Sequence, residues 1–141
     1  MILFFSETKF QLSQKRPLKN WLGKVIKQEN MQIGDINIVF YNDEQLLKLN
    51  KQYLHHDTFT DIITFDYSEK NTLHGDICIS VERVKENAQK FNYAFEEELR
   101  RVMAHGILHL CGYKDKKNED KQLMTQKEES ALLLFNSQFN E

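Results

Sequence analysis

The sequence predicts an α+β fold in which a single mixed sheet of about four strands packs with about five helices. Two observations support this class. Segments with apolar residues at helical spacing are interspersed with β-branched and aromatic segments. They follow one another without internal repeats or a low-complexity linker. With 141 residues and 40% apolar residues, the chain can bury a core. We therefore expect residues 1–141 to form a single domain.

The first part of the chain predicts two strands and two helices. The apolar segment ILFF near the N-terminus is typical of a strand. Pro17 suits the first turn of a helix, which continues to about Asn30 with apolar residues at helical spacing. Residues 36–41 form the next expected strand. Asn42 and Gln45 then resemble a capping pair at the start of a short helix.

The rest of the chain predicts two more strands and three more helices. The segment GDICISV alternates apolar and polar residues as a half-buried strand does, and Ser80 at its end is a suitable N-cap. We expect strands at 61–67 and 75–81, a helix containing Val84, Ala88 and Phe91, a helix from near Phe95 to Gly112, and a last helix at roughly 118–137.

Bulk composition limits the possible classes of function. The net charge is −2, so the chain is not a basic nucleic-acid binder by composition, although this does not exclude a local basic groove. Two cysteines do not make a disulfide framework, which favours a reduced, cytoplasmic protein. The N-terminal residues lack the features of a signal peptide, and no stretch approaches the roughly 20 apolar residues of a membrane span. We expect a cytoplasmic protein with no membrane contact.

The stretch HGILHLCGYKD carries the clearest chemical signal. His105 and His109 are four residues apart, so both imidazoles share one face of the predicted helix. The other faces are apolar, which indicates a buried helix, and buried imidazoles need partners. Gly112 suits a left-handed helix end, after which Asp115 can return to the histidine face. The three residues predict one zinc ion per chain on a zincin-like helix, with a fourth position open for water.

A less specific interpretation is that both histidines are simply packed in the core or exposed, as is common for an isolated HxxxH pair. Cys111 falls on the far side of the helix, and Cys78 lies in a predicted strand, so we expect both in the core. His55, His56 and His74 lie in polar, loop-like stretches and are expected at the surface.

The spacing HxxxHxxGxxD is that of the metzincin metalloproteases, but the general base of such enzymes is missing here. They need a glutamate directly after the first histidine, and this chain has Gly106. Glu98 is two helical turns before His105, on the order of 10 Å away. The site is therefore either not peptidolytic or takes its base from elsewhere.

Three segments of the chain resemble the YbeY family of bacterial rRNA-maturation endoribonucleases. HGILHLCGYKD resembles that family's HGxLHLxGYxH, LNKQYLHHDTFTDIITFD resembles LNxxYRxxDxxTDVLSFP, and GDICIS matches GDIxIS. The resemblance covers about positions 35–135. It implies a small α+β metalloprotein that cleaves single-stranded RNA, acts on the 3′ end of small-subunit rRNA and associates with the ribosome. It also implies the metal ligands His105, His109 and Asp115.

Two residues depart from the family pattern. Asp115 stands where the family usually has histidine, and Leu54 stands where it usually has an arginine thought to help catalysis. A carboxylate is an acceptable zinc ligand, but it reduces the positive charge of the centre. Leu54 removes a cation that could stabilise the charged transition state. Both changes predict a slower ribonuclease than a relative with the usual residues.

Basic residues near the motif are candidates for binding RNA phosphates. They are Arg101, one turn before His105, and Lys114 and Lys116, which flank the third ligand together with Lys117. The first helix is also basic on its outer side. Solvated surface charge is an equally good interpretation of both groups.

The interpretation that best accounts for these features is a zinc-dependent endoribonuclease that acts on rRNA at the ribosome or its small subunit, with no obligate protein partner. The sequence does not identify the catalytic base. Two alternatives remain: a metallopeptidase, and a ribosome-associated binding protein whose metal is structural or vestigial.

Overall fold

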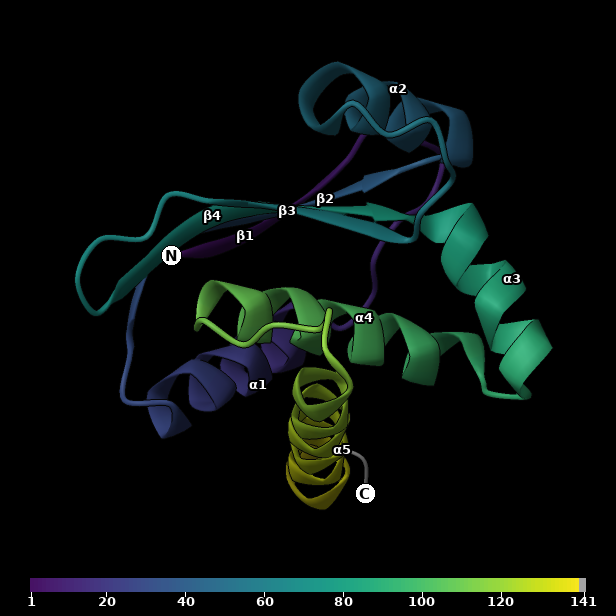
Figure 1. The fold of residues 1–141 in the computed structure, drawn as a ribbon. Helices are drawn as coiled ribbons and strands as arrows, with labels where there is room; N and C mark the ends of the chain where they lie inside the picture. Colours follow the sequence, from purple (N-terminus) through teal and green to yellow (C-terminus); the bar gives the residue numbers. More distant parts are fainter. Residues whose placement is uncertain (140–141) are drawn as a thin grey trace.

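The computed structural model describes residues 1–139 and contains four strands and five helices within that range. The chain therefore has the predicted α+β architecture (Figure 1). In chain order the elements are β1 (Ile2–Ser6), α1 (Lys15–Gln28), β2 (Gln32–Tyr41), α2 (Asp43–Leu54), β3 (Ile62–Asp66), β4 (Thr72–Ser80), α3 (Val81–Phe91), α4 (Phe95–Leu110) and α5 (Asn118–Phe139).

The four strands form one mixed sheet in the order β1-β2-β4-β3. β1 and β2 are parallel, as are β2 and β4, whereas β3 runs antiparallel to β4. The register pairs Ile38 of β2 with Ile77 of β4, and Ile77 in turn with Thr64 of β3. β3 is thus an edge strand that pairs only with β4 within the described sheet.

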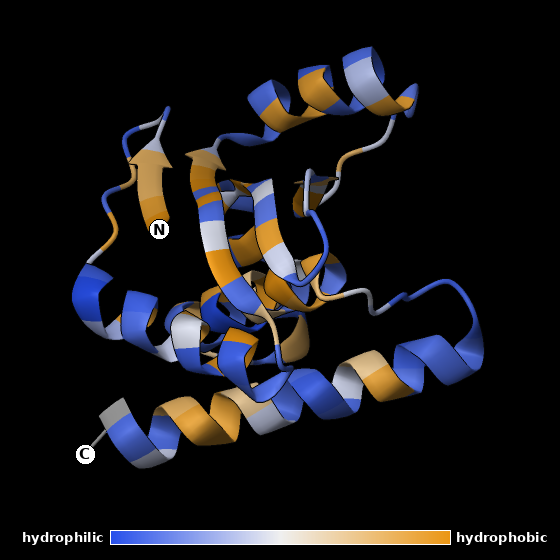
Figure 2. Ribbon diagram, turned by 90° about the vertical axis from the view of Figure 1, so that its left-hand side faces the viewer, coloured by the Kyte–Doolittle hydropathy of each residue, from blue (hydrophilic) through white to orange (hydrophobic). Residues whose placement is uncertain are grey.

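The helices cover the sheet unequally. α1 and α4 lie against one face, with α5 packed across them, whereas α2 lies over the other face (Figure 1). The main core lies between the first face and these helices, and its largest fully buried side chains include Trp21, Phe40 and Met103. Figure 2 shows that α5 is hydrophilic over most of its N-terminal half and hydrophobic near its end. That apolar end packs into the core through Leu132 and Phe135.

Local signals in the sequence explain several element ends. Asn42 accepts from the backbone N–H of Gln45 at 2.8 Å and the Gln45 side chain accepts from the Asn42 N–H at 2.9 Å, which confirms the predicted capping pair. Ser80 Oγ accepts from the N–H of Arg83 at 3.1 Å and caps α3. Gly112 has a φ of 107°, as expected for a glycine that ends a helix.

Some predicted boundaries were wrong. α1 ends at Gln28 rather than near Asn30, and β2 begins at Gln32, four residues before the predicted strand. Val81 was predicted to end a strand, but the cap at Ser80 places it in the first turn of α3. Within the described residues, none of the helices combines the length and the apolar character needed to cross a membrane.

Candidate metal centre

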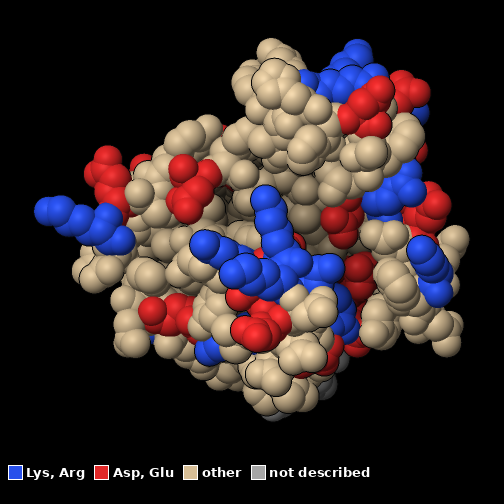
Figure 3. Space-filling model, viewed as in Figure 1, with Lys and Arg blue, Asp and Glu red and all other residues tan. Residues whose placement is uncertain are grey.

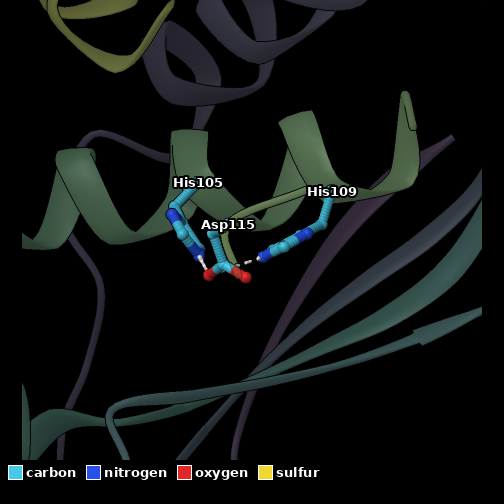
Figure 4. A group of neighbouring side chains, drawn as sticks. All are labelled: His105, His109 and Asp115. Atoms are coloured by element: carbon cyan, nitrogen blue, oxygen red, sulfur yellow. Dashed lines mark hydrogen bonds and ion pairs between the residues drawn. The ribbon is translucent and has the colours of Figure 1, made fainter. Parts of the chain in front are cut away.

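α4 holds both histidines on one face, because positions four apart lie one above the other on a helix. The rings of His105 and His109 are 4.5 Å apart between centroids and nearly perpendicular, at 84°. Both side chains are mostly buried, with exposed fractions of 21% and 25%. Their Nε2 atoms point to the same place in front of the helix (Figure 4).

Asp115 reaches the two rings because the chain reverses after α4. The positive φ of Gly112 turns the backbone, and the N–H of Tyr113 donates to the carbonyl of Leu108 at 3.1 Å. The Oδ2 atom of Asp115 then lies 3.3 Å from Nε2 of His105 and 3.2 Å from Nε2 of His109. The predicted glycine turn thus brings the third residue to the histidines.

The geometry of these three side chains fits a tetrahedral metal ion. At metal–ligand distances of about 2.0–2.1 Å, two ligands of a tetrahedron lie about 3.3 Å apart, close to the two nitrogen–oxygen separations of this site. One ligand atom from each of His105, His109 and Asp115 lies within 4.8 Å of the others, and among the described residues only these three form such a group. Nitrogen and carboxylate donors suit zinc and other divalent ions of the first transition row.

Each histidine is oriented by an acceptor at Nδ1, the ring nitrogen that does not face Asp115. Nδ1 of His105 lies 2.6 Å from Oε2 of Glu128, on α5. Nδ1 of His109 lies 2.9 Å from the carbonyl oxygen of Tyr113. Because an acceptor lies at each Nδ1, the neutral ring can carry its proton there and offer the Nε2 lone pair to an ion, which is the tautomer that a metal ligand requires.

The three side chains open into a cavity of about 370 Å³ between α4 and β3. Two further carboxyl groups, Asp61 and Glu98, line it. Burial raises the pKa of Asp61, although the charge of His105 opposes this effect. Burial likewise raises the pKa of Glu98 against the influence of Arg101. Carboxyl groups with raised pKa values in a cavity are candidates for proton transfer.

The cavity is acidic, which favours a bound cation. Asp61, Glu98, Asp115 and Glu128 all line it, against the single arginine Arg101. Burial alone would lower the pKa of His105, but the hydrogen bond and charge of Glu128, together with other acidic groups, raise it. The acidic groups therefore stabilise a positive charge in the site, either as a proton on His105 or as a metal ion. At neutral pH a metal ion can replace that proton.

The three residues predicted to bind RNA lie in different environments. Arg101 lines the cavity, but its guanidinium forms ion pairs with Glu98 at 3.5 Å and with Glu129, so much of its charge is already compensated. Lys114 and Lys116 are exposed beside the site. Figure 3 shows basic side chains gathered at the centre of this face, over the segment that joins α4 to α5.

The other residues considered from the sequence lie outside the centre. His55 and His56 are exposed, as predicted. His74 is half-buried in β4 rather than in a loop, where its Nδ1 accepts from the backbone N–H of Asp35 at 3.0 Å. Cys78 is buried, whereas Cys111 is only partly buried at the edge of the core. Leu54 is 41% exposed at the end of α2 and does not line the cavity.

Glu128 and Asp61 were missed by the sequence reasoning. Glu128 is 23 residues from His105 and appears in an ordinary charged helical segment, so no local spacing indicated its contact. Asp61 had a weak signal, because it lies in the upstream segment that resembles LNxxYRxxDxxTDVLSFP. Glu98 was considered too far along the helix, yet its side chain lines the same cavity.

Comparison with known proteins gives consistent results. A family model described as Endoribonuclease YbeY matches residues 4–136. A protein named Endoribonuclease YbeY from Christiangramia forsetii is 54% identical over 134 residues, covering 95% of this chain and 94% of that protein. A protein of the same name from Flavobacterium psychrophilum is 51% identical over 140 residues, which cover 99% of this chain and 100% of that protein. The solution structure of TM1509 from Thermotoga maritima superposes with a TM-score of 0.73 at 30% identity. The superposition covers 99% of this chain and 92% of TM1509.

Proposed function

Because this chain belongs to the YbeY family of endoribonucleases, we propose that it is a zinc-dependent enzyme that cleaves single-stranded RNA. We further propose that it matures the 3′ end of small-subunit rRNA in association with the ribosome. The metal ligands in this proposal are His105, His109 and Asp115. The observation that supports it most directly is the convergence of two Nε2 atoms and one carboxylate oxygen in an acidic cavity.

The parts of the site have distinct roles in phosphodiester hydrolysis. When bound, the ion supplies a Lewis acid for a phosphoryl oxygen and lowers the pKa of a coordinated water. Glu128 and the Tyr113 carbonyl hold the two imidazoles in the ligating tautomer. Among the described residues, Arg101 is the one lysine or arginine that lines the cavity, and we assign it contact with an entering phosphate. Asp61 and Glu98 are the groups available to carry a proton.

The proposal can be tested with two substrates and two histidine variants. Wild-type protein loaded with zinc should cleave a single-stranded RNA and should leave the same sequence intact in a duplex. Cleavage should stop when a chelator is added. His105→Ala should lose zinc and lower the cleavage rate by at least a hundredfold. His56→Ala is the matched control, because His56 is an exposed histidine outside the cavity, and it should behave as wild type.

Zinc bound equally by wild type and His105→Ala would refute the assignment of the ligands. Equal cleavage of single-stranded and duplex RNA would refute the strand specificity alone. Binding to purified small subunits, measured with and without zinc, tests the ribosome part separately.

The structure also explains why position 106 cannot supply the base of a metalloprotease. A Cβ atom added to Gly106 would lie 2.8 Å from Cγ2 of Ile77 and 3.0 Å from Cδ1 of Ile62, so this position faces the sheet. A glutamate there would have to enter the core. We therefore expect no zinc-dependent turnover of unstructured peptides, and turnover that disappears in His109→Ala would contradict this expectation.

A further inference from the structure

α5 contacts the metal centre from outside through two neighbouring residues, Lys127 and Glu128. Glu128 Oε2 lies 2.6 Å from Nδ1 of His105. Lys127 Nζ donates to Oε2 of Glu29 at 3.2 Å, and it lies 5.5 Å from the ring centroid of Tyr113. α5 therefore contacts the metal-binding segment, residues 105–115, at two places: at His105 and at Tyr113.

Glu29, Tyr113 and Lys127 form what we call the anchor cluster, which joins the end of α1, the turn after α4, and α5. The Tyr113 hydroxyl donates to Oε1 of Glu29. The Glu29 side chain is only 16% exposed, so its interactions are partly shielded from water.

The anchor cluster is linked to the metal ligands through the backbone of Tyr113. The carbonyl oxygen of Tyr113 accepts from Nδ1 of His109 at 2.9 Å. Asp115, the third ligand, follows two residues later, and its Oδ2 is 3.2 Å from Nε2 of His109. A displacement of Tyr113 would therefore move both the acceptor that orients one ligand and the backbone that presents another.

We propose that α5 is a positioning element of the metal centre: Glu128 fixes the ring of His105, and the anchor cluster fixes the segment that presents Asp115. Ligands that are ordered before the ion arrives lose less conformational entropy when it binds. The affinity for the ion then depends on side chains that do not touch it. This inference rests on the proposed metal-binding function and adds which residues tune it.

The test is the zinc dissociation constant of the full-length metal-free chain, measured by competition with a chromophoric chelator. Tyr113→Phe removes only the hydroxyl, and Glu128→Gln removes the carboxylate charge behind His105. Each should weaken zinc binding, by up to about 10- to 100-fold, the range observed when groups that support metal ligands are changed. Tyr67→Phe and Glu44→Gln are matched controls at exposed positions and should leave the constant unchanged.

A double variant tests whether the contacts act together. If Glu29 acts by holding the Tyr113 hydroxyl, then Tyr113→Phe should weaken zinc binding no further in a Glu29→Ala background. The melting temperature of each metal-free variant is recorded as well. Variants that melt lower but bind zinc as tightly as wild type would show a merely structural role and overturn the inference.

The outcomes also separate the inference from the proposed function. If wild type binds zinc and both substitutions leave the affinity unchanged, only the positioning role fails. If wild type itself binds no zinc, the metal-binding function and the inference fail together. Should Glu128→Gln not fold, Tyr113→Phe decides the question, because it keeps the ring and the backbone carbonyl.

Discussion

The fold buries the carboxyl group of Asp61, and burial disfavours its ionised form. Its Oδ2 lies 3.5 Å from Nδ2 of Asn87, and burial raises its pKa. A carboxyl whose pKa is higher in the folded state than in the unfolded state costs stability wherever it is ionised in both. This cost is fully present above the folded pKa. It disappears as the pH falls below the unfolded value, about 3.9.

We therefore predict that Asp61→Asn stabilises the metal-free protein at pH 7. The melting temperature should rise by on the order of 3 °C, and the difference from wild type should shrink as the pH approaches 4. Circular dichroism melts from pH 4 to 8 with chelator present measure this. Asp57→Asn is the control, because Asp57 forms an exposed ion pair with Lys51 of the kind that contributes little. A stabilisation that is the same at pH 4 and pH 7 would contradict the assignment.

Cys78 and Cys111 are both free thiols, and burial raises the pKa of each to about 12. Little thiolate is present at pH 8, and the thiolate is the reactive form. We predict that iodoacetamide modifies the folded protein at least tenfold more slowly than the unfolded one, with two modified thiols after unfolding without reductant. A Cys78–Cys111 disulfide found by mass spectrometry in fresh protein would contradict this.

The sequence predicted the three residues that the structure brings together as a candidate metal centre, but not the residues that contact the metal-binding segment from α5 and the end of α1. His105, His109 and Asp115 could be found because a four-residue helical spacing and a glycine turn are local geometry. Glu128 lies 23 residues from the histidine it contacts. Glu29 lies 84 residues from Tyr113. Such contacts arise only when α1 and α5 pack around α4, and a single sequence carries no periodic signal for them.

Among the elements, α4 depends on a glycine to approach the sheet. A Cβ atom at Gly106 would lie 2.8 Å from Cγ2 of Ile77, which is attached at the branch point of that side chain. A Cβ atom at Gly23, inside α1, would meet only the terminal Cδ1 of Ile33, at 3.2 Å. The two helical glycines thus differ in how easily their surroundings can move.

We predict opposite effects for the same substitution at these two positions. Alanine is favoured over glycine by about 1 kcal/mol from helix propensity alone, whereas overpacking a core typically costs about 1–3 kcal/mol. Gly106→Ala should therefore destabilise the protein, and Gly23→Ala should be neutral or stabilising. Urea unfolding of both variants, metal-free, provides the comparison. Stabilisation by Gly106→Ala would show that α4 does not need its close contact with the sheet.

The type of every element was predicted, whereas the ends of the strands were not. The first residues of β2 and β4, Gln32 and Thr72, are polar and not buried, so they do not extend the apolar alternation that indicates a strand. They belong to strands because they pair with each other across the sheet. In contrast, the N-caps of α2 and α3, Asn42 and Ser80, were predicted correctly, because a cap is formed by residues close in sequence.

The whole molecule brings together three distant segments around one cavity. The β1-β2-β4-β3 order leaves β3 at the edge, where α4 and Glu128 of α5 close the cavity against it. The sequence did not reveal this order, because each strand pattern is compatible with several neighbours. The result is an acidic cavity on a chain with a net charge of −2, in an enzyme family whose substrate is a polyanion. Positive charge near the entrance must therefore offset this repulsion.

Our last prediction concerns that positive charge. Lys114, Lys116 and Lys117 are exposed on the segment between α4 and α5. If they contact phosphates, replacing all three with alanine should weaken binding of single-stranded RNA. It should also reduce the slope of log affinity against log salt by about 0.7 for each phosphate that is no longer neutralised, or about 2 in total. Fluorescence anisotropy at several salt concentrations measures both, in a His105→Ala background that prevents cleavage.

A charge-matched control separates a local interaction from the effect of net charge. Replacing Lys9, Lys48 and Lys70 with alanine also removes three positive charges, but from segments outside the cavity and its entrance. This variant should keep the wild-type salt slope, because counterions are released only where lysines neutralise phosphates. Equal reductions of affinity and slope in both triple variants would mean that overall charge governs binding, and the three lysines beside the metal centre would then be ordinary solvated side chains.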